Sequence, residues 1–245
     1  MLNKYNHNQI SHKLMQAGLS NYTVIIHEEL VSTNTYALDN IGQLKNNSVI
    51  VCEGQSAGLG RNGKAWTSRP YIDISASFVH KFPLDFDYEL LPLVMAVAVN
   101  RLFKQLRVNT KIKWPNDIWL SNKTKIAGIL LSAKIHANER NIVTGIGLNN
   151  IENWERNNLL LNLIIHVENV LSEYKTFGFA IVRQEWLDNC IHYRKVISLY
   201  QGNELLDHGV HIDLTSNGKI VIEDQKSGEI RGYAGSTISL KFEDQ

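Results

Sequence analysis

The sequence E-G-Q-S-A-G-L-G-R-N-G-K-A-W, residues 53–66, comes directly after an apolar run at residues 49–52 that is typical of a buried strand. It gathers four glycines, two cations and one large aromatic residue: Gly54, Gly58, Gly60, Gly63, Arg61, Lys64 and Trp66. Glycine lets a backbone approach a ligand closely, and free N–H groups beside cations suit an anion such as phosphate or carboxylate. The stretch therefore predicts an anion-binding loop, with a flexible surface turn as the alternative.

A P-loop is excluded within the same stretch. Gly58, Gly63 and Lys64 have the P-loop spacing, but Ala65 stands where that motif requires a magnesium-binding Ser or Thr. The loop must therefore serve another kind of anion site.

The whole chain has the composition of an ordinary globular protein. It holds 245 residues, of which 44% are hydrophobic and 20% charged, and its formal net charge is +1. A charge this close to zero does not provide the broad basic field of a nucleic-acid-binding surface, so we expect no DNA partner.

The cysteines, the histidines and the apolar runs indicate which classes of protein the chain does not resemble. Two thiols, Cys52 and Cys190, do not make a disulfide framework. The nine histidines show no metal-ligand spacing, and we expect the neighbours His208 and His211 on the polar edge of a strand, so no metal site is predicted. The polar N-terminus has no signal-peptide core, and the longest apolar run, residues 90–99, is shorter than the ~20 residues that span a bilayer. A reducing, cytoplasmic setting without a membrane is the expectation.

Hydrophobic periodicity predicts an α+β chain followed by a small all-β region. We expect strands at residues 22–27, 72–80, 111–114, 118–120, 126–135 and 142–148, and helices at 89–106, 160–174 and 179–189. Lys125 is expected to begin the strand that continues through 126–135. From residue 191 onward there are only short alternating strands split by turns, which predicts a small β-barrel. The predicted domains are residues 1–190 and residues 191–245.

A polar triplet, Ser32-Thr33-Asn34, precedes a short stretch of helical residues. Ser32 or Thr33 is suited to cap the helix N-terminus. The alternative is that the exposed N–H groups and hydroxyls also hold a polar ligand.

Polar and cationic motifs recur at three further strand ends. K-W-P-N-D stands at residues 113–117, K-x-x-G-I-L at 125–130 and G-x-G-x-N at 145–149. Together with the S-T-N triplet and with residues 55–66, they resemble in type and order the motifs of the biotin–protein ligases. The resemblance covers nearly the whole chain, including the small β domain.

The resemblance implies a fold and a reaction. The fold is an α+β one, a mixed sheet with helices like that of class II aminoacyl-tRNA synthetases, plus a C-terminal SH3-like barrel. Residues 1–190 would form the catalytic domain that binds biotin and ATP. Biotin's carboxylate would attack the α-phosphate of ATP, with Mg²⁺, to give biotinyl-5′-adenylate, and a lysine of a biotin carboxyl carrier domain would then take the biotinyl group, as in a biotin–[acetyl-CoA-carboxylase] ligase.

The resemblance also implies roles for individual residues. Charge on the α-phosphate needs preorganised cations, and the catalytic residues implied are Lys125 and Arg61. The biotin-binding residues implied are Ser32, Thr33, Asn34, Gln55, Leu59, Gly60, Arg61 and Lys125. The residues implied for ATP and the adenylate are Gly58, Arg61, Trp66, Lys113, Asn116, Asp117 and Asn149. Structural roles stay open as alternatives for three residues. Trp66 and the neighbouring Trp114 are also suited to packing, and Asp117 is also suited to capping a turn.

Two departures from the family pattern stand out. Only about thirty residues precede Ser32, too few for the helix-turn-helix domain of the members that repress transcription, so we expect the enzyme-only class. The first arginine of the family's glycine-rich loop is Leu59 here, which removes one cation. Family members often pair through the large domain's sheet, so a homodimer is possible.

Two rival functions remain at this point. One is a lipoate–protein ligase, which shares the fold and the adenylate chemistry. The other is a non-catalytic biotin-sensing module, to which Leu59 points and against which Arg61 and Lys125 argue.

Overall fold

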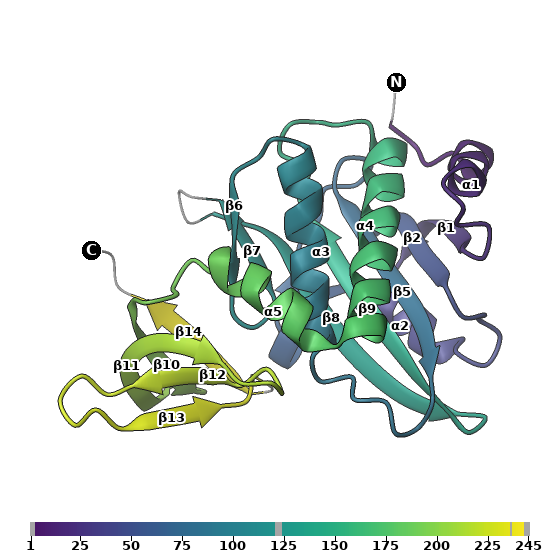
Figure 1. Ribbon diagram of the computed structural model, residues 1–245. Helices are drawn as coiled ribbons and strands as arrows, with labels where there is room; N and C mark the ends of the chain where they lie inside the picture. The colour runs from purple at the N-terminus through teal and green to yellow at the C-terminus, as the bar shows by residue number, and fades with distance from the viewer. Residues whose placement is uncertain (1–2, 121–123, 236, 243–245) are drawn as a thin grey trace. The chain divides into compact units, whose positions relative to one another are not determined.

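The computed structural model describes residues 3–120, 124–235 and 237–242 (Figure 1). Their contacts divide the chain into two compact units. The first unit is Met1–Tyr88 with Thr124–Asn169, and the second is Glu89–Lys123 with Val170–Gln245.

The first unit is built on five strands in the order β1-β2-β5-β9-β8. They are β1 (Thr23–Leu30), β2 (Ser48–Gln55), β5 (Ile74–Phe82), β9 (Glu139–Leu148) and β8 (Lys125–His136). β1 and β2 pair parallel, whereas the other neighbours pair antiparallel. The unit also holds α1 (His7–Gln16), α2 (Thr33–Asp39), the hairpin of β3 (Gly58–Leu59) and β4 (Ala65–Trp66), and the 3₁₀ turn η1 (Arg61–Gly63). Its sheet is covered on one side by a hydrophobic cluster: Ala37, Ile41, Leu44, Ile50, Val79 and Val143.

A buried ion pair ties four segments of this unit together. The guanidinium of Arg156, which is fully buried, donates to a carboxylate oxygen of Glu53 at the end of β2. It also donates to the backbone carbonyls of Asn3, at 2.9 Å, and Asp73, at 3.1 Å. The second carboxylate oxygen of Glu53 accepts the backbone N–H of Tyr5 at 2.8 Å. Both charges are therefore paired and hydrogen-bonded, as buried charges must be.

The second unit joins helices to a small antiparallel sheet. Its first half contains α3 (Leu91–Gln105), β6 (Thr110–Lys113) and β7 (Asp117–Leu120). Its second half contains α5 (Phe179–Asp188), β10 (Val196–Gln201), β11 (Glu204–Leu214), β12 (Ile220–Glu223), β13 (Ile230–Tyr233) and β14 (Ile238–Phe242). α4 (Arg156–Phe177) begins in the first unit and ends in the second. The side chain of Arg101 in α3 bridges Glu173 and Glu185, at 2.7 and 2.6 Å, and so links three helices.

The expected fold class is confirmed: the chain is α+β, and an antiparallel sheet in the order β13-β12-β11-β10-β14 follows the helices (Figure 1). The helix predicted at 89–106 is α3, which is buried almost all round, as its uniformly apolar sequence requires. α4 starts four residues before the predicted 160, because the Glu155 carboxylate caps it by accepting the N–H groups of Asn157 and Asn158. The domain division at residues 190 and 191 stays a proposal.

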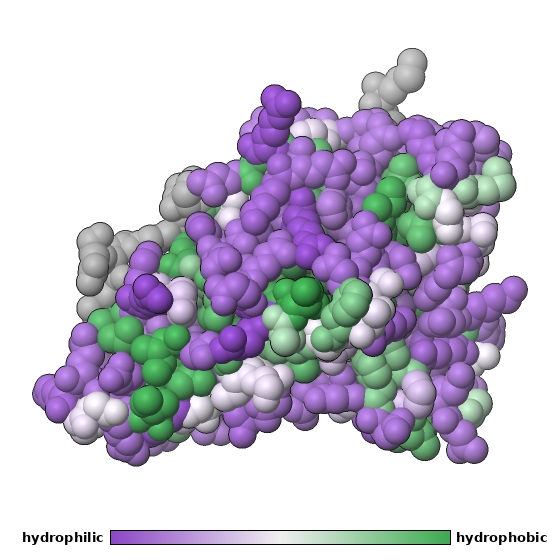
Figure 2. Space-filling view, viewed as in Figure 1, coloured by the Kyte–Doolittle hydropathy of each residue, from purple (hydrophilic) through white to green (hydrophobic). Residues whose placement is uncertain are grey.

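Membrane-spanning helices are absent from the described part of the chain, since none of its helices is both long and apolar enough. On the face drawn in Figure 2, hydrophilic side chains predominate and the hydrophobic ones form small separate groups.

The Glu53–Arg156 pair generates a stability prediction. Glu53→Ala leaves the Arg156 guanidinium buried without its counter-ion, so it should lower the free energy of unfolding by about 3–5 kcal/mol, measured by urea denaturation. Lys4→Ala is the matched control, because it removes the surface pair Lys4–Glu28, whose side chains are 51% and 61% exposed. An equal effect of the two substitutions would contradict the structural role of the buried pair.

Candidate ligand site

The polar triplet at the start of α2 is buried and internally bonded. Ser32, Thr33 and Asn34 are 2%, 3% and 5% exposed, which is unusual for such residues. The Ser32 hydroxyl accepts the N–H of Thr35 at 3.5 Å, which confirms the predicted cap. Thr33 donates its N–H and its hydroxyl to Oε1 of Gln55, at 2.8 and 3.2 Å. The structure thus brings together the four polar residues predicted to bind one ligand.

Asn34 is the residue of this group whose hydrogen bonding is incomplete. Its Oδ1 accepts the hydroxyl of Ser132 at 3.0 Å, but its buried Nδ2 has no hydrogen-bond partner among the described residues. A ligand that brings an acceptor to this Nδ2 would complete its hydrogen bonding.

Two serines that the sequence analysis did not single out complete the polar group. Ser77 on β5 donates its hydroxyl to that of Thr33 at 2.9 Å, and Ser132 lies on β8. The sequence feature that could have revealed Ser77 is a serine inside an apolar strand, where it is fully buried between hydrophobic neighbours.

The glycine-rich stretch folds as a tight hairpin instead of an open loop. β3 pairs with β4, and the N–H of Gly60 donates to the carbonyl of Lys64 at 2.7 Å. A Cβ on Gly58 would lie 2.4 Å from the Trp66 carbonyl oxygen, so only glycine fits there. Leu59 points outward and is 44% exposed, while Arg61 lies half-buried in η1.

The indole of Trp66 lies directly on two facing glycines of the sheet. Gly128 on β8 and Gly147 on β9 are register partners. A Cβ on Gly147 would stand 2.2 Å from the indole, and one on Gly128 would stand 3.2 Å from it. The glycines of the K-x-x-G and G-x-G motifs therefore form the flat surface on which the hairpin docks.

Lys125 joins this group at the first residue of β8, where the sequence predicted a strand start. Its Nζ lies 5.5 Å from the centre of the Trp66 ring, a cation–π contact, and 3.1 Å from the Cβ position of Gly128. The side chain is exposed, so its ammonium remains accessible to a ligand.

Asn149, which the resemblance assigns to ATP and the adenylate, is oriented by an aspartate that the motifs did not reveal. Its Nδ2 donates to the Asp73 carboxylate at 3.2 Å, which also accepts the N–H of Asn150 at 2.9 Å and the guanidinium of Arg69 at 2.7 Å. Burial raises the pKa of Asp73, but the hydrogen bonds from Arg69, Asn150 and Asn149 outweigh it and hold the pKa below its ordinary value. An ionised Asp73 only accepts, so Oδ1 of Asn149 faces away from it.

The K-W-P-N-D residues belong to the second unit and turn from β6 into β7. Lys113 and Asp117 are register partners across that turn, and Nζ of Lys113 lies 4.4 Å from the centre of the Trp119 ring. Asn116 is 7% exposed. A common site of these residues with the glycine-rich hairpin stays a prediction.

Comparisons with known proteins agree with this set of motifs. A family model described as the biotin/lipoate A/B protein ligase family matches residues 28–149. The bifunctional ligase/repressor BirA of Escherichia coli is 28% identical over 235 residues, covering 86% of this chain and 71% of that protein. The chloroplastic biotin–protein ligase 1 of Arabidopsis thaliana is 26% identical over 216 residues, covering 82% of this chain and 55% of its own. The biotin protein ligase of Aquifex aeolicus, solved with biotin and ATP, superposes with a TM-score of 0.78 at 20% identity, covering 90% of this chain and 99% of that one.

Residues 28–149 form a domain of the biotin/lipoate A/B protein ligase family. The proteins named above from Arabidopsis thaliana and Aquifex aeolicus are biotin–protein ligases, and the resemblance seen in the motifs is confirmed.

The contact of Trp66 with Gly147 generates the next prediction. Gly147→Ala places a methyl group inside the indole, so the hairpin of residues 58–66 should detach, and trypsin should cut after Arg61 and Lys64 much faster than in the wild type. Gly145→Ala on the same strand is the control, because its Cβ meets its nearest atom at 3.4 Å, an ordinary contact. Equal cleavage rates in the two variants would show that Trp66 does not anchor the hairpin.

Proposed function

We propose that this chain is an ATP-dependent biotin–protein ligase. A carboxylate oxygen of biotin attacks the α-phosphorus of ATP, and the bond to pyrophosphate breaks. The amine of an acceptor lysine then attacks the acyl carbon of biotinyl-5′-adenylate, forms an amide and releases AMP and a proton. The acceptor is a lysine of a biotin carboxyl carrier domain. Family membership and the relatives named above support this assignment.

The observation that carries the proposal is the buried polar group around Asn34. Its hydroxyls and amides suit a small neutral ring with both donors and acceptors, which describes the ureido ring of biotin. The unpaired Nδ2 of Asn34 would donate to a ring carbonyl. Lipoate carries a dithiolane ring without such groups and would leave that N–H unpaired, which is strongly unfavourable in a buried site.

Two cations of the first unit, Lys125 and Arg61, support the adenylation step. The carboxylate of biotin and the triphosphate of ATP are both anions, and charge grows on the α-phosphate during the attack. Lys125, whose Nζ lies over the Trp66 ring, and Arg61, in the docked hairpin, would stabilise that charge. Leu59 and Gly60 would line the aliphatic side chain of biotin.

The resemblance assigns two sets of residues to the nucleotide. Trp66, Gly58 and Asn149 would bind the adenylate, with Oδ1 of Asn149 available to a donor on the base. Lys113, Asn116 and Asp117 would bind the phosphates. The oxygen atoms of Asn116 and Asp117 are ligands of the type that Mg²⁺ takes, and the ion would neutralise phosphate charge when bound.

The test is ATP–pyrophosphate exchange measured with biotin, with lipoate and with neither acid. We expect biotin to be favoured by on the order of 10⁴-fold. Exchange with lipoate at the same rate would overturn the choice of substrate, and exchange with neither acid would indicate a non-catalytic module. Transfer is then followed with labelled biotin on a carrier domain, using the same domain without its acceptor lysine as control.

Lys125→Ala should lower the rate of pyrophosphate exchange by about 100- to 1,000-fold, because it removes a preorganised cation from the α-phosphate. Lys134→Ala is the matched control on the same strand, since the exposed Lys134 contacts only the carbonyl of Leu38 among the bonds described. Circular dichroism verifies the fold of both variants. A folded Lys125→Ala protein with normal exchange would refute the assigned role.

Leu59→Arg should tighten binding of a biotinyl-adenylate analogue a few-fold at low salt, with the gain shrinking as salt rises. The physical reason is that Leu59 is 44% exposed, so an added cation at this position stays partly solvated while it attracts the phosphate. Calorimetric titration at two salt concentrations measures this. Weaker binding at both would mean that Leu59 packs on an apolar neighbour once the ligand is bound.

A further inference from the structure

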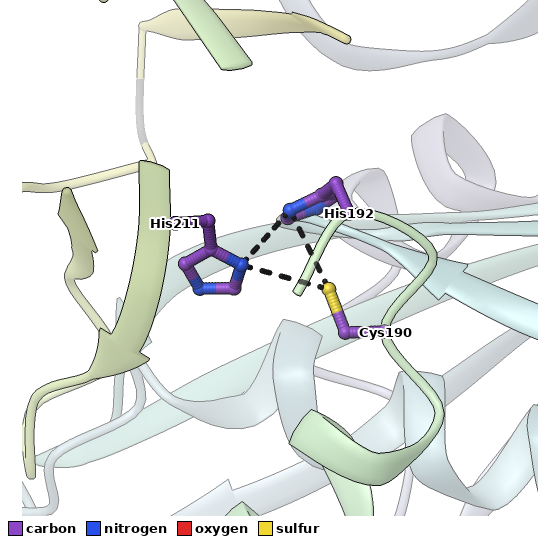
Figure 3. Close-up of side chains that lie close together, drawn as sticks. All are labelled: Cys190, His192 and His211. Carbon is purple, nitrogen blue, oxygen red and sulfur yellow. Dashed lines mark hydrogen bonds between the residues drawn. The ribbon is translucent and has the colours of Figure 1, made fainter. Parts of the chain in front are cut away.

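Three side chains with metal-ligand chemistry lie together in the second unit (Figure 3). His211 comes from β11, and Cys190 and His192 come from the segment after α5; all three are buried. The two Nδ1 atoms are 3.0 Å apart, and Sγ of Cys190 lies 3.5 Å from Nδ1 of His192 and 3.9 Å from Nδ1 of His211. The expectation that His211 lies on a polar strand edge is therefore wrong. It lies three residues from His208, and residues an odd number apart face opposite sides of a strand.

The separations approach those of a tetrahedral zinc site, whose nitrogen and sulfur ligands stand roughly 3.3–3.6 Å apart. The hydrogen bond at Nε2 of His192 argues against a zinc site. The backbone N–H of Trp114 donates to Nε2 of His192 at 3.0 Å, so Nε2 holds a lone pair. A neutral imidazole has one proton, which must then sit on Nδ1, the atom that a metal would need free.

The second histidine takes the opposite tautomer. Nε2 of His211 lies 3.0 Å from the backbone carbonyl of Asp213, which only accepts, so Nε2 carries the proton. Nδ1 of His211 is then the acceptor for Nδ1–H of His192. Three hydrogen bonds thus run in one direction, from Trp114 through His192 and His211 to Asp213. Burial raises the pKa of Cys190 to about 12, so its thiol stays protonated beside them.

We propose that His192 and His211 are positioning residues that hold the K-W-P-N-D turn through the backbone of Trp114. The inference rests on the proposed function, in which Lys113, Asn116 and Asp117 of that turn bind ATP. The N–H of Trp114 is buried and would be left unpaired without His192, at a penalty that favours a displaced turn. The rings of Trp114 and Pro115 also pass close to Gly235, whose added Cβ would meet both at 3.0 Å.

The relay works only while both rings are neutral. Burial lowers the pKa of His192 well below its ordinary value, with contributions from His211, Lys113 and Lys195. Burial lowers the pKa of His211 to about 4, although Asp213 acts in the opposite direction. Both pKa values lie below the ~6.5 of an unfolded chain, so the stability that the neutral pair contributes is full above that pH and is lost as pH falls toward 4. Protonation of His211 would place an N–H at its Nδ1, facing the Nδ1–H of His192, so the hydrogen bond between the two rings would be lost.

Nitrogen-15 NMR of the wild-type protein at neutral pH tests the tautomers without any substitution. We expect His192 protonated at Nδ1 and His211 protonated at Nε2. The same tautomer in both rings, or one zinc ion per chain in the purified protein by elemental analysis, would overturn the relay.

Matched amide variants test the positioning role. The oxygen of Gln reaches the place of Nε2 and that of Asn the place of Nδ1, so His192→Gln keeps an acceptor for Trp114 and His192→Asn does not. We expect pyrophosphate exchange to fall about 100-fold in His192→Asn, as for a misplaced binding group, through kcat and the KM for ATP. His192→Gln should keep most of the activity, and the affinity for biotin should stay unchanged in both. Equal activity of two folded variants would overturn the proposal.

A second pair covers the case in which His192→Asn fails to fold. His211→Asn keeps an acceptor at the place of Nδ1, whereas His211→Leu has none, so the Asn variant should be the more active of the two. The reverse order would overturn the proposal. A wild-type protein without biotin-dependent exchange would refute the proposed function instead, and the NMR tautomers would still decide the relay.

Discussion

The buried charge of Arg156 is the constraint on which most of the first unit depends. A guanidinium that is fully buried requires an ionised partner and acceptors for its remaining N–H groups, and it finds them in Glu53 and in the carbonyls of Asn3 and Asp73. Glu53 stands two residues before Gln55, and the carboxylate of Asp73 orients Asn149. One buried cation therefore fixes the backbone from which both proposed binding regions, for the polar ring and for the base, project.

Close backbone approach is the second constraint. The glycine motifs do not leave an open loop, because the indole of Trp66 fills the space above Gly128 and Gly147. The same indole meets Nζ of Lys125, so the cation, the hairpin and the sheet are positioned by one aromatic ring. Packing and ligand binding are therefore not alternatives for Trp66: a ring that packs on the sheet also determines where the charged groups stand.

Much of this arrangement could be predicted from the sequence, and the remainder has a common physical cause. Local patterns revealed α3, the capped start of α2, the strand start at Lys125 and the antiparallel C-terminal sheet, since each depends on neighbours a few residues away. Glu53 and Arg156 are 103 residues apart, and Asn149 and Asp73 are 76 apart, so no local period connects them. Such polar pairs are specified by the tertiary fold. His211 lies on the buried face, and not on a polar strand edge beside His208, because strand faces alternate between the two residues; a bulge between His211 and Asp213 then interrupts this alternation.

The two units satisfy their buried polar groups in different ways: the first with an ion pair, the second with neutral imidazoles. This difference agrees with the proposed chemistry. The first unit buries an ion pair, Arg156–Glu53, whereas its cations Lys125 and Arg61 are exposed and half-buried, respectively. The second unit anchors its turn with two neutral imidazoles, although Lys113 and Lys195 stand close enough to lower the pKa of His192. A positively charged anchor at that place would add a third cation beside Lys113 and Lys195, and the repulsion would destabilise the fold in the absence of phosphate. A carboxylate anchor would instead compete with the phosphate for Lys113. A neutral relay accepts the buried N–H of Trp114 without placing a further charge beside Lys113.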